Sequence, residues 1–197
     1  MAFQTLIEGE KGKLVICKNY VTVDLFEFLN RLPFNIEPEI FIFGRTMRQR
    51  RDVLFYSNES EGYKYSGQIM RSVPFSGQEG EFLLALMQRV NQSLGTNFNG
   101  ILINRYQDGT KTIGAHSDDE KGLDANNSSV ASISFGAART FRIRDKHTKE
   151  IVVDVQTESG ILILMSGNFQ RSYTHEISQQ KTIHNSRISL TFRSHKE

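Results

Sequence analysis

The sequence predicts a mainly β protein of the α+β class, in which a double-stranded β-helix, or jelly roll, is braced by N-terminal helices. Two helical patterns occur before residue 95, whereas the rest of the chain contains short β-like runs separated by turns. Helices first and many strands afterwards favour a sandwich or jelly roll. We expect one folded domain, made of an N-terminal extension with a short helix (1–40), a lid with its supporting helix (41–97) and the jelly-roll core (98–197).

The N-terminal half contains two amphipathic helical patterns. In segment 24–32 the carboxylate of Asp24 can cap a short helix with one apolar face. Segment 79–94 is the clearest helix, because its apolar residues recur at helical spacing and Gly95 follows as a stop signal. Between them the pattern predicts two short strands and an alternating aromatic and polar segment, at 41–43, 53–56 and 63–67.

Short β-like runs dominate the chain after residue 98. They lie at 100–106, 130–135, 140–144, 151–155, 160–165 and 187–193. In a jelly roll the strands converge on one open mouth, so that residues far apart in sequence can meet at one site.

The composition is that of an ordinary globular protein, with 23% charged and 38% hydrophobic residues and a net charge of +2. This charge is too small to indicate nucleic-acid binding by itself. Basic residues are concentrated in two stretches, 45–51 and 139–146. Each stretch is either a phosphate-binding patch or a solvated face, and the sequence leaves both interpretations open.

Cys17 is the single cysteine of the chain, which excludes an intrachain disulfide and a cysteine-based zinc site. We therefore expect a reducing, intracellular setting, with nucleus and cytoplasm not distinguished. No apolar run approaches the length of a membrane span, and the first residues lack the pattern of a signal peptide. No feature predicts an oligomer, so we expect a monomer without membrane contact.

His116, Asp118 and His175 are the candidate metal ligands. Two imidazoles and one carboxylate can hold Fe(II) on one face and leave the other face open. His116 and Asp118 share a direction if they leave a strand together, and His175 follows a second predicted strand. The alternative is a chance His-x-Asp pair on the surface. The other histidines, His147, His184 and His195, have no carboxylate in a matching strand context, and we expect them to face solvent.

Two further pairs of residues share a side of their predicted strands. Arg187 and Arg193 are six residues apart, so both face the same side, and a buried guanidinium fork suits a dicarboxylic acid. The alternative for either arginine is a structural ion pair. Asn104 and Tyr106 also share a face and can donate hydrogen bonds to a carboxylate, although both residue types are also found in ordinary sheets.

These motifs, in this order, resemble the AlkB family of Fe(II)/2-oxoglutarate dioxygenases. The matching segments run from Asn104 to Gly109, from His116 to Glu120 and from Ser132 to Gly136, followed by His175 and the Arg187-x5-Arg193 stretch. The resemblance implies a jelly roll that uses Fe(II), 2-oxoglutarate and O₂. It implies that the metal ligands and catalytic residues are His116, Asp118 and His175. It further implies that the co-substrate is bound by Asn104, Tyr106, Arg187, Thr191 and Arg193.

Within the family the chain is most similar to the nuclear homologues that repair 1-methyladenine and 3-methylcytosine in DNA. This similarity implies that residues 41–97 include a nucleotide-recognition lid and that the substrate is alkylated DNA. A base in a duplex must be extruded before it can reach a buried iron. The implied substrate contacts are Phe43, Tyr63, Tyr65, Ser66, Asp119 and Glu120. Phe43 is either a wedge that fills the gap left by the extruded base or a core residue.

The sequence departs from the family pattern at Ser189, where an asparagine is usual, which removes one amide contact to 2-oxoglutarate. It does not decide between DNA and RNA, or between single and double strands. An oxygenase acting on a protein or lipid, and a non-catalytic nucleic-acid-binding jelly roll, remain the alternatives from other functional classes.

Overall fold

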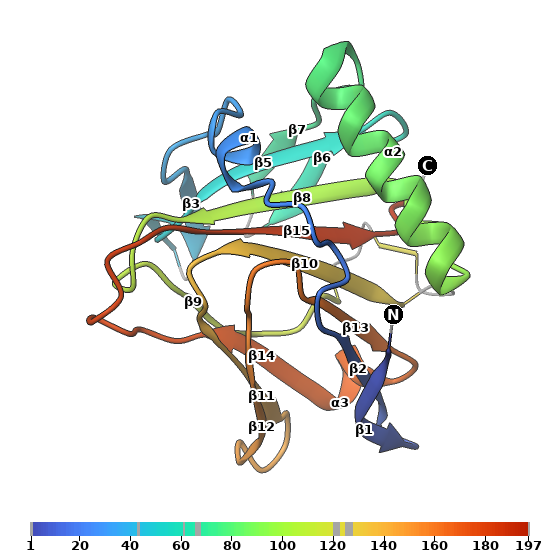
Figure 1. Ribbon diagram of the computed structural model, residues 1–197. Helices are drawn as coiled ribbons and strands as arrows, with labels where there is room; N and C mark the ends of the chain where they lie inside the picture. Colours follow the sequence, from blue (N-terminus) through green and yellow to red (C-terminus); the bar gives the residue numbers. More distant parts are fainter. Residues whose placement is uncertain are drawn as a thin grey trace.

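The computed structural model describes residues 2–42, 44–60, 62–65, 68–119, 123–124 and 128–196. Its centre consists of two antiparallel β-sheets that face each other (Figure 1). The larger sheet has seven strands, in the order β1 (Gln4–Gly9), β2 (Gly12–Cys17), β13 (Leu162–Ser166), β10 (Val130–Gly136), β15 (Arg187–Arg193), β8 (Gly100–Tyr106) and β5 (Asp52–Ser57).

The smaller sheet has four strands, in the order β12 (Ile151–Gln156), β11 (Thr140–Asp145), β14 (Tyr173–Ile177) and β9 (Ile113–His116). The strands of each sheet come from distant parts of the chain, as a jelly roll requires. The predicted mainly β, jelly-roll fold is therefore confirmed. The six strands predicted after residue 98 are all present, with ends shifted by no more than two residues.

Helix α2 (Gly77–Leu94) lies along the outer face of the larger sheet (Figure 1). It buries Leu83, Met87 and Val90 against this sheet, and it ends at Gly95, whose φ of +65° is the left-handed conformation that glycine tolerates best. The short helix α1 (Phe26–Asn30) also belongs to this layer and is shorter than predicted, although Asp24 does accept a hydrogen bond from the backbone N–H of Phe26. No helix within the described ranges is long and apolar enough to cross a membrane.

The two faces of strand β15 border different parts of the molecule, namely the apolar core under the helices and the pocket between the two sheets. All of its residues are buried, yet they face two different layers. Ile188, Leu190 and Phe192 pack in the apolar cluster beneath the helices, whereas Arg187 and Arg193 line a pocket between the two sheets. Alternation along a strand places successive side chains on opposite faces, so the two arginines share one side, as their spacing predicts.

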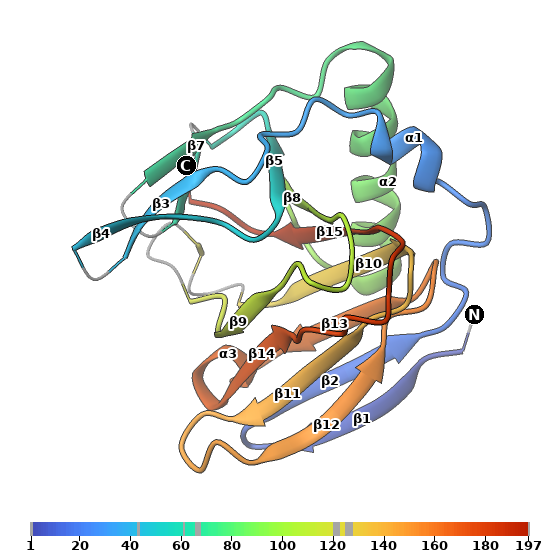
Figure 2. The same ribbon diagram turned by 90° about the vertical axis from the view of Figure 1, so that its left-hand side faces the viewer.

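Two hairpins project beside the jelly roll, on the side away from the helices (Figure 2). One pairs β3 (Glu39–Ile42) with β4 (Arg45–Arg48), and the other pairs β6 (Gly62–Tyr65) with β7 (Gln68–Arg71). Arg51 connects them to the centre, because its side chain lines both the pocket between the sheets and a cavity of about 360 Å³ between the hairpins. Residues 41–97 thus contain the hairpin of β6 and β7 and the supporting helix, together with the hairpin of β3 and β4 except for its first two residues.

Several elements have no clear signal in the sequence. The hairpin of β1 and β2 extends the larger sheet next to β13, so that residues 1–40 contribute more than a short helix. The strand β1 is exposed or half-buried throughout, and without one buried face it lacks the alternation that marks a strand. A strand leading into His116 and a second one supplying His175 were expected without bounds, and the structure has them as β9 and β14. The short helix α3 (Phe169–Ser172) was not predicted, and the three elements together position the metal ligands.

Candidate active site

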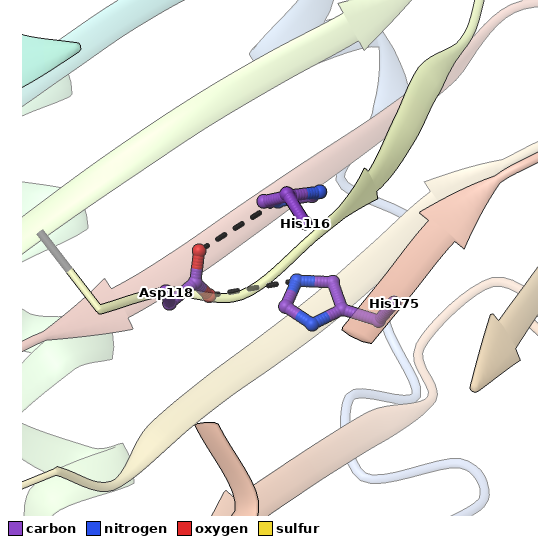
Figure 3. Close-up of side chains that lie close together, drawn as sticks. All are labelled: His116, Asp118 and His175. Carbon is purple, nitrogen blue, oxygen red and sulfur yellow. Dashed lines mark ion pairs between the residues drawn. The ribbon is translucent and has the colours of Figure 1, made fainter. Parts of the chain in front are cut away.

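The three candidate metal ligands converge between the two sheets (Figure 3). His116 ends β9 and pairs in register with His175 on β14, and the two ring centroids are 4.3 Å apart. Asp118 follows β9 by two residues and turns back toward both rings. One ligand atom from each residue lies within 4.8 Å of the others, so the three can hold one metal ion.

The loop that carries Asp118, called the ligand loop, is held in place by contacts from α3 and β14. The backbone N–H of Asp118 donates to Oε1 of Gln170 (2.9 Å), and the Ser117 hydroxyl donates to the carbonyl of Tyr173 (2.8 Å). Both partners lie in the segment that leads from α3 into β14. The ligand loop is therefore fixed against the strand that carries His175.

The surroundings hold the ligands in the protonation states that bind metal. Burial would raise the pKa of Asp118, but the charge of Arg193, joined in acid by the protonated histidines, outweighs it and keeps this pKa at about 2. Burial lowers the pKa of His175 to about 3 and also lowers the pKa of His116. The site therefore presents a carboxylate and two neutral imidazoles at neutral pH.

The residues present fit an iron ion. Nε2 of His116 and Nε2 of His175 lie 3.7 Å and 3.6 Å from the two oxygens of Asp118. Nδ1 of His116 is hydrogen-bonded to the carbonyl of Gly114 (2.8 Å), which orients the ring with Nε2 toward the site. Oδ2 of Asp118 is buried and has no hydrogen-bond partner within the described ranges, as expected of a metal ligand.

A pocket beside this triad contains a buried cation without a carboxylate partner. Arg187 is 3% exposed and forms no ion pair within the described residues, and its Nη1 has no hydrogen-bond acceptor there. Its guanidinium lies 5.4 Å from the centre of the Tyr106 ring. Burial lowers the pKa of Arg187 to about 10, so the side chain remains charged at neutral pH. A buried, unpaired guanidinium is suited to bind an anionic ligand.

The other predicted co-substrate residues lie in the same pocket. Asn104 and Tyr106 on β8 line it together with Thr191 and Arg193 on β15. Ser189, at the position where asparagine was expected, lines it as well. Arg193 differs from Arg187 because its Nη2 donates to Oδ1 of Asp118 at 2.5 Å, so that one metal ligand already neutralises it.

Arg51 is a pocket residue that sequence reasoning did not single out. It belongs to the basic stretch 45–51, but its side chain is 5% exposed, and Nε donates to Oδ1 of Asn104 at 2.9 Å. The neighbouring Arg50 donates to the carbonyl of Thr110, and Arg45 and Arg48 are exposed on β4. Local sequence gives no sign of which arginine is buried, because burial depends on the packing of β5 against β8.

The second basic stretch is not an open phosphate-binding patch. Arg139 is fully buried, and Arg142, Arg144 and Lys146 form ion pairs with Asp154, Glu176 and Asp119, respectively. The interpretation of this stretch as a phosphate-binding patch is therefore wrong, because Arg139 is buried on backbone carbonyls and the other three charges are paired with carboxylates.

The predicted substrate contacts are only partly described. Phe43, Ser66 and Glu120 lie outside the described residues, as do the side chains of Tyr63 and Tyr65 on β6. Asp119 is described: it is exposed next to Asp118 and paired with Lys146 at 2.9 Å.

The three remaining histidines do not behave alike. His147 and His184 are exposed as predicted. His195, expected to face solvent, is 7% exposed, and its ring lies 4.9 Å from that of Phe55. This expectation was wrong because the chain after β15 stays against the sheet, where the backbone N–H of His195 donates to Asn99.

Comparison with protein families agrees with this geometry. Residues 23–193 match the model of the 2OG-Fe(II) oxygenase superfamily, and the chain belongs to this superfamily. Its predicted use of Fe(II) and 2-oxoglutarate with O₂ is thereby confirmed, since the match spans the His116, Asp118 and His175 cluster.

Individual relatives identify the chain as an AlkB-type member, as its motifs predict. It is 32% identical to DNA oxidative demethylase ALKBH2 of Mus musculus over 162 residues, covering 79% of this chain and 66% of the relative. For the Homo sapiens protein of that name the identity is 32%, with 77% and 59% covered. Alpha-ketoglutarate-dependent dioxygenase alkB homolog 3 of Rattus norvegicus is 33% identical, with 57% and 40% covered.

The chain thus spans less than two thirds of the length of the ALKBH2 proteins it matches, 66% in mouse and 59% in human. A solved structure, described as that of OsALKBH1, superposes with a TM-score of 0.59 at 17% identity and covers 98% of this chain and 100% of that one. At this identity the likeness shows the fold alone.

Proposed function

We propose that the protein is an Fe(II)/2-oxoglutarate-dependent demethylase that removes N-linked methyl groups from bases in DNA. The observation that carries the proposal is one pocket that holds both the His116, Asp118 and His175 cluster and the unpaired, buried Arg187. A metal site with an open face next to a buried guanidinium suits a metal-bound dicarboxylic 2-oxo acid.

Eight residues of the pocket have a role in this proposal. His116, Asp118 and His175 bind Fe(II), which supplies, with 2-oxoglutarate and O₂, the oxidising chemistry that hydroxylates a methyl carbon. Arg187 pairs with the far carboxylate of 2-oxoglutarate, and Asn104, Tyr106 and Thr191 line its binding site. Arg193 compensates the charge of Asp118 and keeps that ligand ionised. Loss of formaldehyde from the hydroxylated methyl group restores the base.

The two hairpins support a nucleic-acid substrate. They expose apolar and basic side chains together, namely Phe41, Met47, Ile69, Arg45, Arg48 and Arg71. Basic side chains attract the phosphate backbone, and apolar ones can replace stacking lost when a base is extruded. The relatives named DNA oxidative demethylase favour DNA over RNA as the substrate.

The extruded base would reach the iron from the side of these hairpins. We assign it to a position next to the His116 ring and Asp119, and we keep Tyr63, Tyr65, Ser66 and Glu120 as the other substrate contacts that the family resemblance implies. Asp119 is suited to this role because its carboxylate is 58% exposed and next to a metal ligand. Asp119 is paired with Lys146 in this structure. When the base displaces Lys146, the freed carboxylate would favour 1-methyladenine and 3-methylcytosine, whose N-alkylation leaves the base cationic.

The test is demethylation of four matched oligonucleotides, single- and double-stranded DNA and RNA, each with one 1-methyladenine. The protein is supplied with Fe(II), 2-oxoglutarate and ascorbate, and the bases and succinate are measured by mass spectrometry. We expect loss of methyl from DNA with matching succinate, and none with the His116→Ala variant, which lacks one ligand. Loss only from RNA would contradict the DNA assignment. Succinate formation without any demethylation would show an oxygenase with another substrate.

A further inference from the structure

Two hydroxyl groups, those of Thr157 and Ser134, accept hydrogen bonds from the guanidinium of Arg187. Nε donates to Oγ1 of Thr157 at 3.0 Å, and Nη2 donates to Oγ of Ser134 at 2.9 Å. All three residues are at most 3% exposed. With Nε and Nη2 engaged in this way, Nη1 is the nitrogen whose hydrogen-bonding capacity stays unused within the described residues.

Thr157 is the more rigid of the two supports. Its hydroxyl donates to the carbonyl of Arg139 (3.0 Å) and accepts from the backbone N–H of that residue (3.1 Å). The backbone N–H of Thr157 also donates to this carbonyl, at 2.9 Å. Because a hydroxyl has one donor and two acceptor positions, its last acceptor position is the one that Arg187 fills. Thr157 is thus fixed in one orientation, toward Arg187.

Arg139, which is hydrogen-bonded to Thr157, also contacts the loops that border the pocket. Its guanidinium donates to the carbonyls of Asp108, Lys111 and Ser178 at 2.7 to 2.9 Å, and it is fully buried. These carbonyls belong to the loops that follow β8 and β14, which carry Tyr106 and His175. Thr157 is therefore connected, through Arg139, to the two strands that carry Tyr106 and His175.

We propose that Thr157, together with Ser134, is a positioning residue that directs the free Nη1 of Arg187 toward the co-substrate and thereby selects dicarboxylic over monocarboxylic 2-oxo acids. The inference rests on the proposed function, in which Arg187 pairs with the far carboxylate of 2-oxoglutarate. A guanidinium held at two nitrogens loses little conformational freedom on binding, so more of the ion-pair energy remains for selectivity.

The test measures binding of two 2-oxo acids, with Mn(II) in place of Fe(II), by calorimetry. 2-Oxoglutarate has the far carboxylate, and 2-oxopentanoate carries a methyl group in its place. For Thr157→Val, which keeps the shape and removes the hydroxyl, we expect 2-oxoglutarate to bind about tenfold more weakly, the lower end of the effect typical of supporting residues. Binding of 2-oxopentanoate should be unchanged.

Three further variants separate positioning from general damage. Thr157→Ser keeps the hydroxyl and should restore the affinity of the parent for 2-oxoglutarate. Ser134→Ala removes the other support and should shift the preference between the acids in the same direction as Thr157→Val. Thr140→Val is the matched control, because the Thr140 hydroxyl bonds to Gln156 rather than to Arg187. It should leave both affinities unchanged.

The outcomes distinguish the role of Thr157 from the role of Arg187. An equal loss of affinity for both acids in Thr157→Val, or no loss for either, would overturn the role of Thr157 while the parent still prefers 2-oxoglutarate. Equal affinities for the two acids in the parent itself would instead overturn the assignment of Arg187, and with it the selectivity proposed here.

Discussion

At the scale of residues, the partner of each buried arginine decides what it can do. Arg139 is satisfied by backbone carbonyls, and Arg193 is paired with Asp118. Arg187 is held by two hydroxyls and has no carboxylate partner in the described part of the chain. Hydroxyls orient a guanidinium without neutralising it, so its charge stays available to a ligand.

His195 provides a residue-scale prediction for stability. Burial, and then the charge of Arg193, lower its pKa to about 4, whereas in the unfolded chain it is about 6.5. The unfolded state binds more protons between these values, so stability is lost as the pH falls through this window. From about pH 7.5 to about pH 5 this histidine should cost roughly 2 kcal/mol of unfolding free energy.

Urea unfolding of the metal-free protein at the two pH values measures this loss. His195→Gln removes the titrating group and should show a smaller decrease on acidification than the parent. His184→Gln is the control, because His184 is exposed and should not change the pH dependence. If the parent and His195→Gln lost the same stability, the buried histidine would not be the cause.

At the scale of elements, alternation along two paired strands separates the core from the pocket. In β8, Ile101 and Ile103 face the helices, while Leu102 and Asn104 face the pocket. Strand β15 pairs with it in a register that sets Ser189 opposite Asn104. Helix α2 covers the apolar face of both strands, so it supports the wall that carries the co-substrate residues.

The packing of α2 gives a prediction at this scale. Leu83 is completely buried in the cluster beneath the helix. Leu83→Ala should lower the free energy of unfolding by about 3 kcal/mol, through lost burial and the cavity that remains. Gln88→Ala, on the exposed face of the same helix, should change it by less than about 0.5 kcal/mol. Urea unfolding measures both values, and comparable effects would show that α2 does not support the core.

At the scale of the whole molecule, the site exists only when distant segments meet. The metal ligands come from β9, the loop after it and β14, and the co-substrate residues come from β8 and β15. The unfolded chain cannot bring these groups together, so ligands that bind the site favour the folded state.

This linkage predicts that metal and co-substrate stabilise the protein. With both ligands present at about 100 times their dissociation constants, each should add about 2.7 kcal/mol to the free energy of unfolding. Thermal unfolding with Mn(II) and 2-oxoglutarate, before and after a chelator, measures the effect as a reversible rise in melting temperature. The His116→Ala variant should show little rise. An equal rise in that variant would place the metal elsewhere.

The sequence by itself determined the jelly roll and the long helix, and it predicted His116, Asp118 and His175 as metal ligands, which the structure brings together. Helix and strand periodicities are local, and the shared side of Arg187 and Arg193 follows from their spacing alone. The His-x-Asp pair is local as well, since two side chains two residues apart at the end of one strand can reach one ion.

Only the tertiary structure decided which charges are buried and what each of them contacts. Arg51 and Arg139 sit in stretches that look like surface patches, yet one contacts Asn104 and the other binds backbone carbonyls. Thr157 and Ser134 are 23 residues apart in the sequence. They meet at Arg187 only because β10 pairs with β15 and because Thr157, directly after β12, is hydrogen-bonded to Arg139 at the start of β11. Burial and partnership depend on contacts between distant segments, which no local pattern encodes.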